Sequence, residues 1–333
     1  MKKAYIDNLS FLKLIAVIGI IVCHMGLLES WQLCARMVEV LFILSGFLMA
    51  YNHYEEKETT GGWQIIKSKL PRFYPIHLLC FMLQFLFVAT WATKPLSYFF
   101  SVGLLNLSLQ HAWFIGTEFS YNNVSWYLSA LVFAYAMTPV IKKIIKESET
   151  KPYGLLKIFL SVVIVRFYLE YLVEHAHRYV PLDLHCNPFV QMLNYSLGYM
   201  TGVLFLRKNV LNQTLGKTLS DNALTLLQSA IIGLYLAICY CFAGSLRFYF
   251  ILSALPLVYV LGFNRGLLQK ISALKPVQYF AKMTLELFMF HSFILYKLPT
   301  TPDNPLSYLI FLSVTVIVAI LYHTIYVKIR KRF

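Results

Sequence analysis

The sequence predicts an all-α fold, a polytopic bundle of transmembrane helices that forms a single integral-membrane domain over residues 1–333. The composition favours this class, because 59% of the residues are hydrophobic and only 13% are charged, about half the charged fraction usual in soluble proteins. Apolar segments of about 20 residues, the length that crosses a bilayer, recur along the whole chain. These observations leave no room for a separate soluble domain.

We expect ten membrane spans, in chain order at residues 9–28, 37–53, 75–93, 124–141, 155–173, 188–206, 221–242, 246–263, 283–298 and 305–327. A further apolar segment, 97–112, is expected to be re-entrant or to lie on the membrane surface. If it crossed, the lysines of residues 142–151 would lie on the side opposite the amino terminus. That arrangement would break the charge pattern of the other loops.

Positive charge sets the expected orientation. Of the 29 Lys and Arg residues, 21 fall in loops on the side of the amino terminus, five in loops on the other side and three within spans. Because Lys and Arg accumulate in cytoplasmic loops, both termini are expected in the cytoplasm. The net charge of +14 is thereby explained by topology, so membrane lipids are expected partners and nucleic acid is not.

The longest expected cytoplasmic connection is the loop 54–74. It begins acidic and becomes basic and aromatic, and its second half is expected to lie amphipathically on the inner leaflet. Pro71 and Pro75 flank Arg72 and predict a short rigid corner there. The alternative is that this segment only follows the positive-inside pattern and carries an interfacial aromatic belt.

The first span carries two ionisable side chains, Lys13 and His24. Charged groups inside a membrane are costly and by default indicate function. Eleven residues apart, the two fall within roughly 20° of one helix face and about 16 Å apart along it. The alternative is that Lys13 snorkels to the headgroups and His24 satisfies a loop contact.

Further polar residues are grouped by expected depth. Glu39 starts the second span at the level of His24 and could orient that imidazole as a general base. Lys13, Lys69 and Arg72 share the inner level and form a cationic mouth suited to an anionic ligand. Two residues on one helix, Arg166 and Glu170, are four positions apart and are expected to form a structural ion pair. His291 lies deep in the span 283–298, and no metal site is expected, since the histidines of loop 174–187 lack ligand spacing.

Several motifs resemble those of the membrane acyltransferase family three, the multi-pass enzymes that O-acylate surface polysaccharides. The opening has Lys13 and, eleven positions later, His24; the segment 38–48 (VEVLFILSGFL) resembles the family's second span. The segment 69–75 (KLPRFYP) is similar to its Arg-x-x-Arg-Ile-x-Pro corner, and 125–129 (SWYLS) to its Trp-x-Leu-Ser motif. The chain departs from the family in having Lys13 for Arg, Glu39 for Asp, and no acidic residue after the last motif.

The resemblance implies an enzyme of the bacterial inner membrane. It implies that His24, helped by Glu39, is catalytic, and that Lys13, Lys69 and Arg72 bind acyl-CoA, with acetyl-CoA as the expected donor. The acceptor would be a hydroxyl of a surface glycan or lipid-linked sugar. The expected substrate-binding residues are Ser45, Trp126, Ser129 and His291. The alternative functions are a translocase for polysaccharide or lipid-linked sugar, which makes no bond, and a structural subunit.

Overall fold

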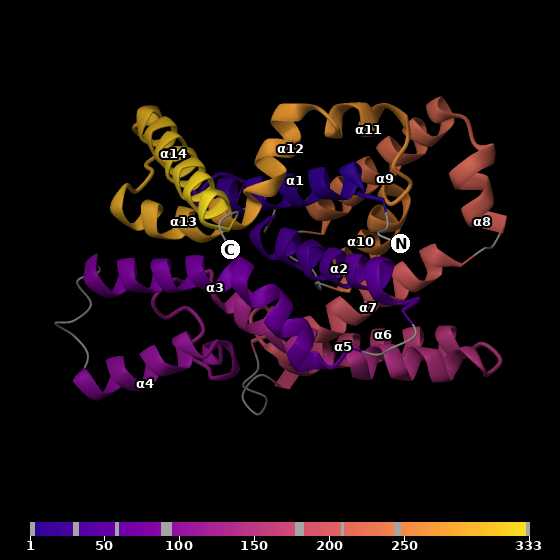
Figure 1. The fold of residues 1–333 in the computed structure, drawn as a ribbon, viewed down its shortest axis with the longest axis horizontal. Coiled ribbons are helices and arrows are strands. Elements are labelled where there is room, and N and C mark those ends of the chain that lie inside the picture. Colours follow the sequence, from indigo (N-terminus) through magenta and orange to yellow (C-terminus); the bar gives the residue numbers. More distant parts are fainter. Residues whose placement is uncertain are drawn as a thin grey trace.

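The computed structural model describes residues 4–28, 33–56, 60–87, 95–176, 183–207, 210–242 and 248–330, and within these ranges every regular element is a helix (Figure 1). The predicted all-α class is therefore confirmed for this part of the chain. In order, the elements are α1 (Asp7–His24), α2 (Leu33–His53), α3 (Gly62–Phe87), α4 (Leu96–Leu107), the 3-10 turn η3 (His111–Trp113), α5 (Trp126–Glu149), α6 (Gly154–Ala176), α7 (Pro188–Leu206), α8 (Val210–Gln213), the π-helical turn η4 (Thr214–Thr218), α9 (Asp221–Cys241), α10 (Phe248–Leu261), α11 (Gly266–Ser272), α12 (Lys275–Lys282), α13 (Thr284–Lys297) and α14 (Pro305–Arg330).

Helix α2 lies in the middle of the bundle, with α1 on one side and α7 on the other (Figure 1). The contact between α2 and α7 is the most extensive in the molecule. Glycines make it possible: a Cβ added at Gly46 would collide with the carbonyl oxygen of Tyr195, and one at Gly198 with that of Ile43. Small residues allow such close backbone approach between membrane helices.

Six helices in the described ranges are long and apolar enough to cross a membrane, namely α1, α2 over Ala35–His53, α3, α5, α9 and α14. The predicted count of ten spans is thus not confirmed. The expected spans at 155–173 and 188–206 coincide with α6 and α7, whose length is sufficient but whose sequences carry charged or polar side chains. The spans at 246–263 and 283–298 fall on α10 and α13, which have 14 residues each.

Fourteen residues make a helix of about 21 Å, shorter than the roughly 30 Å hydrocarbon core. A seventh candidate span combines Tyr249–Leu261 with Gly266–Ser272, and its two parts are bent by 84°. The segment expected to be re-entrant or interfacial contains α4, which has only 12 residues. At about 18 Å it is also too short to cross alone.

The predicted rigid corner at Pro71 and Pro75 is wrong, because α3 begins at Gly62 and continues through both prolines. A proline inside a helix lacks the N–H that would bond the carbonyl four residues earlier. Pro75 therefore leaves the Pro71 carbonyl without its helical donor, and the Tyr326 hydroxyl of α14 donates to that oxygen at 3.1 Å. Most of the expected loop 54–74 is thus the first part of a long helix.

Two buried ion pairs lie inside the bundle. Arg166 and Glu170 of α6 are joined at 2.8 Å, which confirms the predicted structural pair. Arg36 and Glu39 of α2 lie 3.9 Å apart, and the Arg36 guanidinium stacks 3.5 Å above the ring of Phe250 in α10. Charges inside an apolar bundle require such partners.

We expect Gly198→Ala to lower the free energy of unfolding by about 1–3 kcal/mol, because the added methyl group forces α2 and α7 apart. Thermal unfolding of the purified protein in detergent measures the change. Gly233→Ala in α9 is the matched control, since nothing lies within 4 Å of a Cβ there. Equal stability of the two variants would contradict the importance of the α2–α7 contact.

Candidate active site

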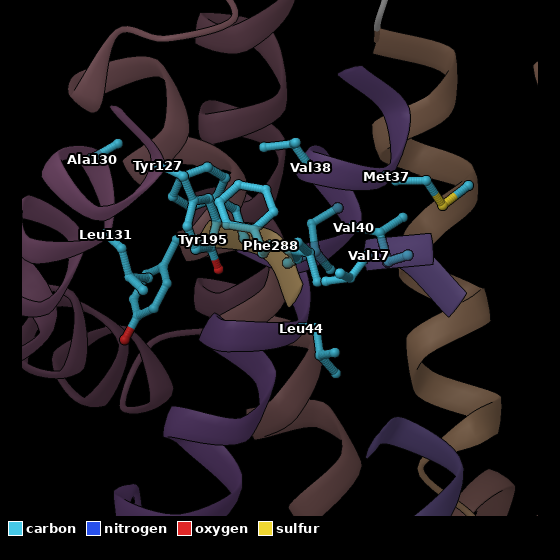
Figure 2. Close-up of a cluster of buried hydrophobic side chains, with 14 of the residues drawn as sticks. Val17, Met37, Val38, Val40, Leu44, Tyr127, Ala130, Leu131, Tyr195 and Phe288 are labelled. Carbon is cyan, nitrogen blue, oxygen red and sulfur yellow. The ribbon is translucent and has the colours of Figure 1, made fainter. Parts of the chain in front are cut away.

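A cavity of about 400 Å³ lies between α1, α2, α3, α5 and α13. We call this the basic cavity, because its lining includes four cationic side chains, Lys13, Lys69, Arg72 and Lys282. The three cations expected at one level are therefore brought together, and Lys282 of α12 joins them. The rest of its wall is largely apolar and includes Val17, Tyr127, Leu131 and Phe288, which Figure 2 shows within the packed core.

The cations of the basic cavity differ in their partners. Within the described ranges, the ammonium groups of Lys13, Lys69 and Lys282 form no hydrogen bond and no ion pair within 4.0 Å, although the charge of Glu286 acts on Lys13. The Arg72 guanidinium, by contrast, donates to both carboxylate oxygens of Glu286, at 2.8 and 2.7 Å. Three lysine charges are thus available to an anionic ligand, while Arg72 forms part of the wall.

The pair of Arg72 and Glu286 joins three helices. Glu286 of α13 is fully buried, Arg72 of α3 is 30% exposed, and His323 of α14 contacts the same carboxylate at 2.7 Å. Arg72 also donates to the carbonyl of Lys282 at 3.0 Å and lies over the ring of Tyr326. An acidic residue such as Glu286 in an apolar segment indicates that a cation lies beside it in the fold. The sequence alone did not identify Arg72 as that cation.

At the far end of α1, His24 meets His291 of α13. The Nδ1 atom of His24 and the Nε2 atom of His291 are 2.8 Å apart, and the rings are stacked at 15°. One of these nitrogens must donate to the other. When His24 Nδ1–H is the donor, the Nε2 atom of His24 keeps its lone pair for a substrate proton.

The two rings differ in accessibility. His291 is fully buried, whereas His24 is exposed by the same measure. The pair therefore has one imidazole that can reach a substrate and one that is held inside the protein. His291, one of the expected substrate-binding residues, contacts His24 in the structure.

The expected partnership of His24 with Glu39 is not what the structure records. Glu39 is buried beside Arg36, on the side of α2 that faces Phe250 and Tyr235, whose hydroxyl donates to the Arg36 carbonyl at 3.4 Å. The sequence predicted the depth of Glu39 in the membrane but not which neighbouring helix its side chain faces. That orientation depends on how the helices pack, which cannot be read from a short stretch of sequence.

A second, smaller cavity of about 60 Å³ is lined by His24 and His185, and we call it the histidine cavity. Trp126, an expected substrate-binding residue, lines it and packs edge-on against the His185 ring, with 4.4 Å between centroids. His185 precedes α7 and was considered in the sequence only as a metal ligand. Its proximity to Trp126 could not be seen in the sequence, because 59 positions separate them.

The two serines expected to bind substrate have different surroundings. Ser45 lines the basic cavity, and its hydroxyl donates to the Leu41 carbonyl at 2.7 Å. Ser129 is buried outside both cavities, and its hydroxyl donates to the Leu109 carbonyl at 2.7 Å. The hydroxyl of Ser129 therefore ties α5 to the segment before η3.

Another buried histidine lies outside the two cavities. His111 of η3 faces the hydroxyl of Ser125 at 3.1 Å and stacks near His77 of α3. Burial and the nearby His77 lower the pKa of His111 to about 3, so it stays neutral. Over the described ranges, no group of three or more His, Cys, Asp or Glu side chains could hold a metal ion.

A family model described as an acyltransferase domain matches residues 5–324, which include both cavities. The chain belongs to acyltransferase family three. No curated protein and no solved structure gave a match. Membership in family three makes the protein an acyltransferase, and its apolar helices are consistent with a multi-pass membrane protein.

We expect Glu286→Gln to lower the free energy of unfolding by about 2 kcal/mol, because it leaves the Arg72 charge without its partner. The loss is smaller than for a fully buried pair, since Arg72 is partly exposed to solvent. Replacing Arg72 by Gln as well should recover part of the loss. Thermal unfolding of the single and double variants measures the coupling between them.

The control is Glu147→Gln, which breaks an exposed pair with Lys143 at 3.9 Å. Its effect should not exceed about 0.5 kcal/mol. If Glu286→Gln were as mild as this control, the pair would not hold the three helices together.

Proposed function

We propose that the protein is an integral-membrane O-acyltransferase. It transfers an acyl group, acetyl in our proposal, from acyl-CoA to a hydroxyl of a surface polysaccharide or lipid-linked sugar. The observation that carries this proposal is the arrangement along α1: Lys13 lines the basic cavity together with Lys69 and Lys282, and an exposed histidine with a buried partner lies at the far end of the helix.

The basic cavity suits an acyl-CoA donor. CoA carries phosphate groups at one end and the thioester at the other, so a polyanionic head and an extended arm must be accommodated together. Lys13, Lys69 and Lys282 supply point charges for phosphate, and charge-assisted bonds to them are stronger than neutral ones. Lys13 stands where the family has Arg, which keeps the charge but gives up the planar two-pronged contact.

His24 supplies the base of the proposed reaction. Its Nε2 atom takes the proton of the acceptor hydroxyl as that oxygen attacks the thioester carbonyl. The C–O bond forms, the C–S bond breaks, and CoA leaves as the thiol with the proton that His24 had taken. His291 is a positioning residue here, because it touches His24 and fixes its tautomer, the task we had assigned to Glu39.

We further propose that the basic cavity opens to the cytoplasm and the histidine cavity to the outside of a bacterial inner membrane. The expected excess of Lys and Arg on the side of the amino terminus supports this orientation. In the expected topology, the amino-terminal side of the membrane carries Lys69, Arg72 and Lys282. The opposite side carries Trp126 and His185. Donor and acceptor would then arrive from opposite sides of the bilayer.

We expect His24→Ala to lower CoA release from acetyl-CoA in the presence of acceptor by at least about 100-fold, the lower range for a lost general base. A thiol-release assay with purified protein and acceptor glycans measures it. His175→Ala, at an exposed position of α6, is the control and should retain activity.

His291→Gln, which keeps a hydrogen-bonding side chain, should retain more turnover than His291→Ala, with the KM for acetyl-CoA unchanged in both. Equal CoA release by wild type and His24→Ala would refute the mechanism. A translocase would show no CoA release in any variant and would lose glycan export instead.

We expect Lys13→Ala to weaken acetyl-CoA binding about tenfold, the value of one charge-assisted contact, and Lys13→Arg to be tolerated. Calorimetric titration at two salt concentrations measures the affinity and its electrostatic part. Lys270→Ala is the control, because Lys270 is an exposed cation of α11 outside the cavity. An unchanged affinity in Lys13→Ala would remove Lys13 from the donor site.

A further inference from the structure

The basic cavity and the histidine cavity are separate, yet they touch at one side chain. Phe288 of α13 is the only residue that lines both, among the residues that the structure describes around them. Lys13 and His24 share a face of α1 in the sequence analysis, yet Lys13 lines the basic cavity and His24 the histidine cavity.

Only a short distance along the helices separates the basic cavity from the histidine cavity. In α1, Val17 lines the basic cavity and Ile20 the histidine cavity; in α2, Leu41 lines the basic cavity and Val38 the histidine cavity. Both pairs are three residues apart, which is about 4.5 Å along a helix axis. The two cavities therefore follow each other at adjacent levels, and the ring of Phe288 lies between them.

The surroundings of Phe288 are aromatic. It is only 3% exposed, and its ring lies 5.4 Å from that of Tyr127 and 5.9 Å from that of His291. Figure 2 shows Phe288 beside Tyr127 within the cluster of buried side chains. Its position three residues before His291 on α13 places it one turn from the histidine pair.

We propose that Phe288 is a gate that decides whether the donor thioester meets His24. This inference rests on the proposed acyltransferase function. While the ring is in place, a thioester in the basic cavity is shielded from water that reaches the exposed His24. When the ring turns aside, the cavities join, and the carbonyl meets the acceptor hydroxyl at His24 Nε2.

Without the gate, water replaces the acceptor. The water oxygen bonds to the acyl carbon as His24 takes its proton, the C–S bond breaks, and CoA leaves as the thiol with that proton. The acyl group is released as the free acid. Phe288 therefore sets specificity for transfer over hydrolysis, and is not needed for bond cleavage itself.

The first test measures thiol release from acetyl-CoA with no acceptor present. Phe288→Ala should release CoA severalfold faster than wild type, and Phe288→Leu should be intermediate. Adding His24→Ala to Phe288→Ala should abolish the gain. The matched control is Phe290→Ala, which removes an equally buried ring that packs on Tyr322, outside both cavities.

The second test needs no acyl-CoA. Ser45→Cys places a thiol in the basic cavity of a variant without native cysteines, and an impermeant thiol reagent is applied to right-side-out and inside-out membrane vesicles. With Phe288 present, labelling should occur from one face only. With Phe288→Ala or Phe288→Leu it should occur from both, and with Phe290→Ala from one.

The outcomes separate the two proposals. Labelling from both faces with Phe288 present, or from one face only in both Phe288 variants, overturns the gate whatever the chemistry. If wild type releases CoA with acceptor present, acceptor-free release that stays at the wild-type rate in Phe288→Ala also overturns the gate. Absence of CoA release in every variant even with acceptor present, together with the expected labelling, refutes the acyltransferase proposal and leaves the barrier at Phe288 intact.

Discussion

The ion pair between Arg72 and Glu286 is the interaction on which the candidate site depends. A carboxylate buried in an apolar bundle requires a cation, and the packing of α3 against α13 brings Arg72 to Glu286. His323 adds α14 to the same group. The pair thus fixes the wall of the basic cavity. Glu286 holds the Arg72 guanidinium in place, and its charge also acts on Lys13, which lines the same cavity.

Much of this site could be predicted from the sequence, because helical spacing places Lys13 and His24 at two depths of one helix, and local motifs group Lys69 and Arg72. The partners could not. His24 meets His291 across 267 positions and Arg72 meets Glu286 across 214, and such pairings depend on how the helices are rotated against each other.

The predicted count of ten spans is not confirmed, for a related reason. Polar side chains buried between helices, as in α7, lower the hydropathy of segments that still lie inside the bundle, and α10 and α13 are shorter than a bilayer. Yet α13 carries Glu286, Phe288 and His291 within six residues. The carboxylate of the ion pair, the ring of Phe288 and the buried histidine therefore lie on a single short helix. Any shift of α13 along its axis would move all three together.

The prolines of α3 give the carboxyl-terminal helix an unusual attachment. Tyr326 of α14 bonds a carbonyl that is free only because Pro75 has no amide hydrogen, and the same ring underlies the guanidinium of Arg72. A break in the hydrogen-bond ladder of one helix thus serves as the docking point of another. The last helix is thus attached beside the basic cavity through the Pro71 carbonyl, which the amide hydrogen of any other residue at position 75 would have occupied.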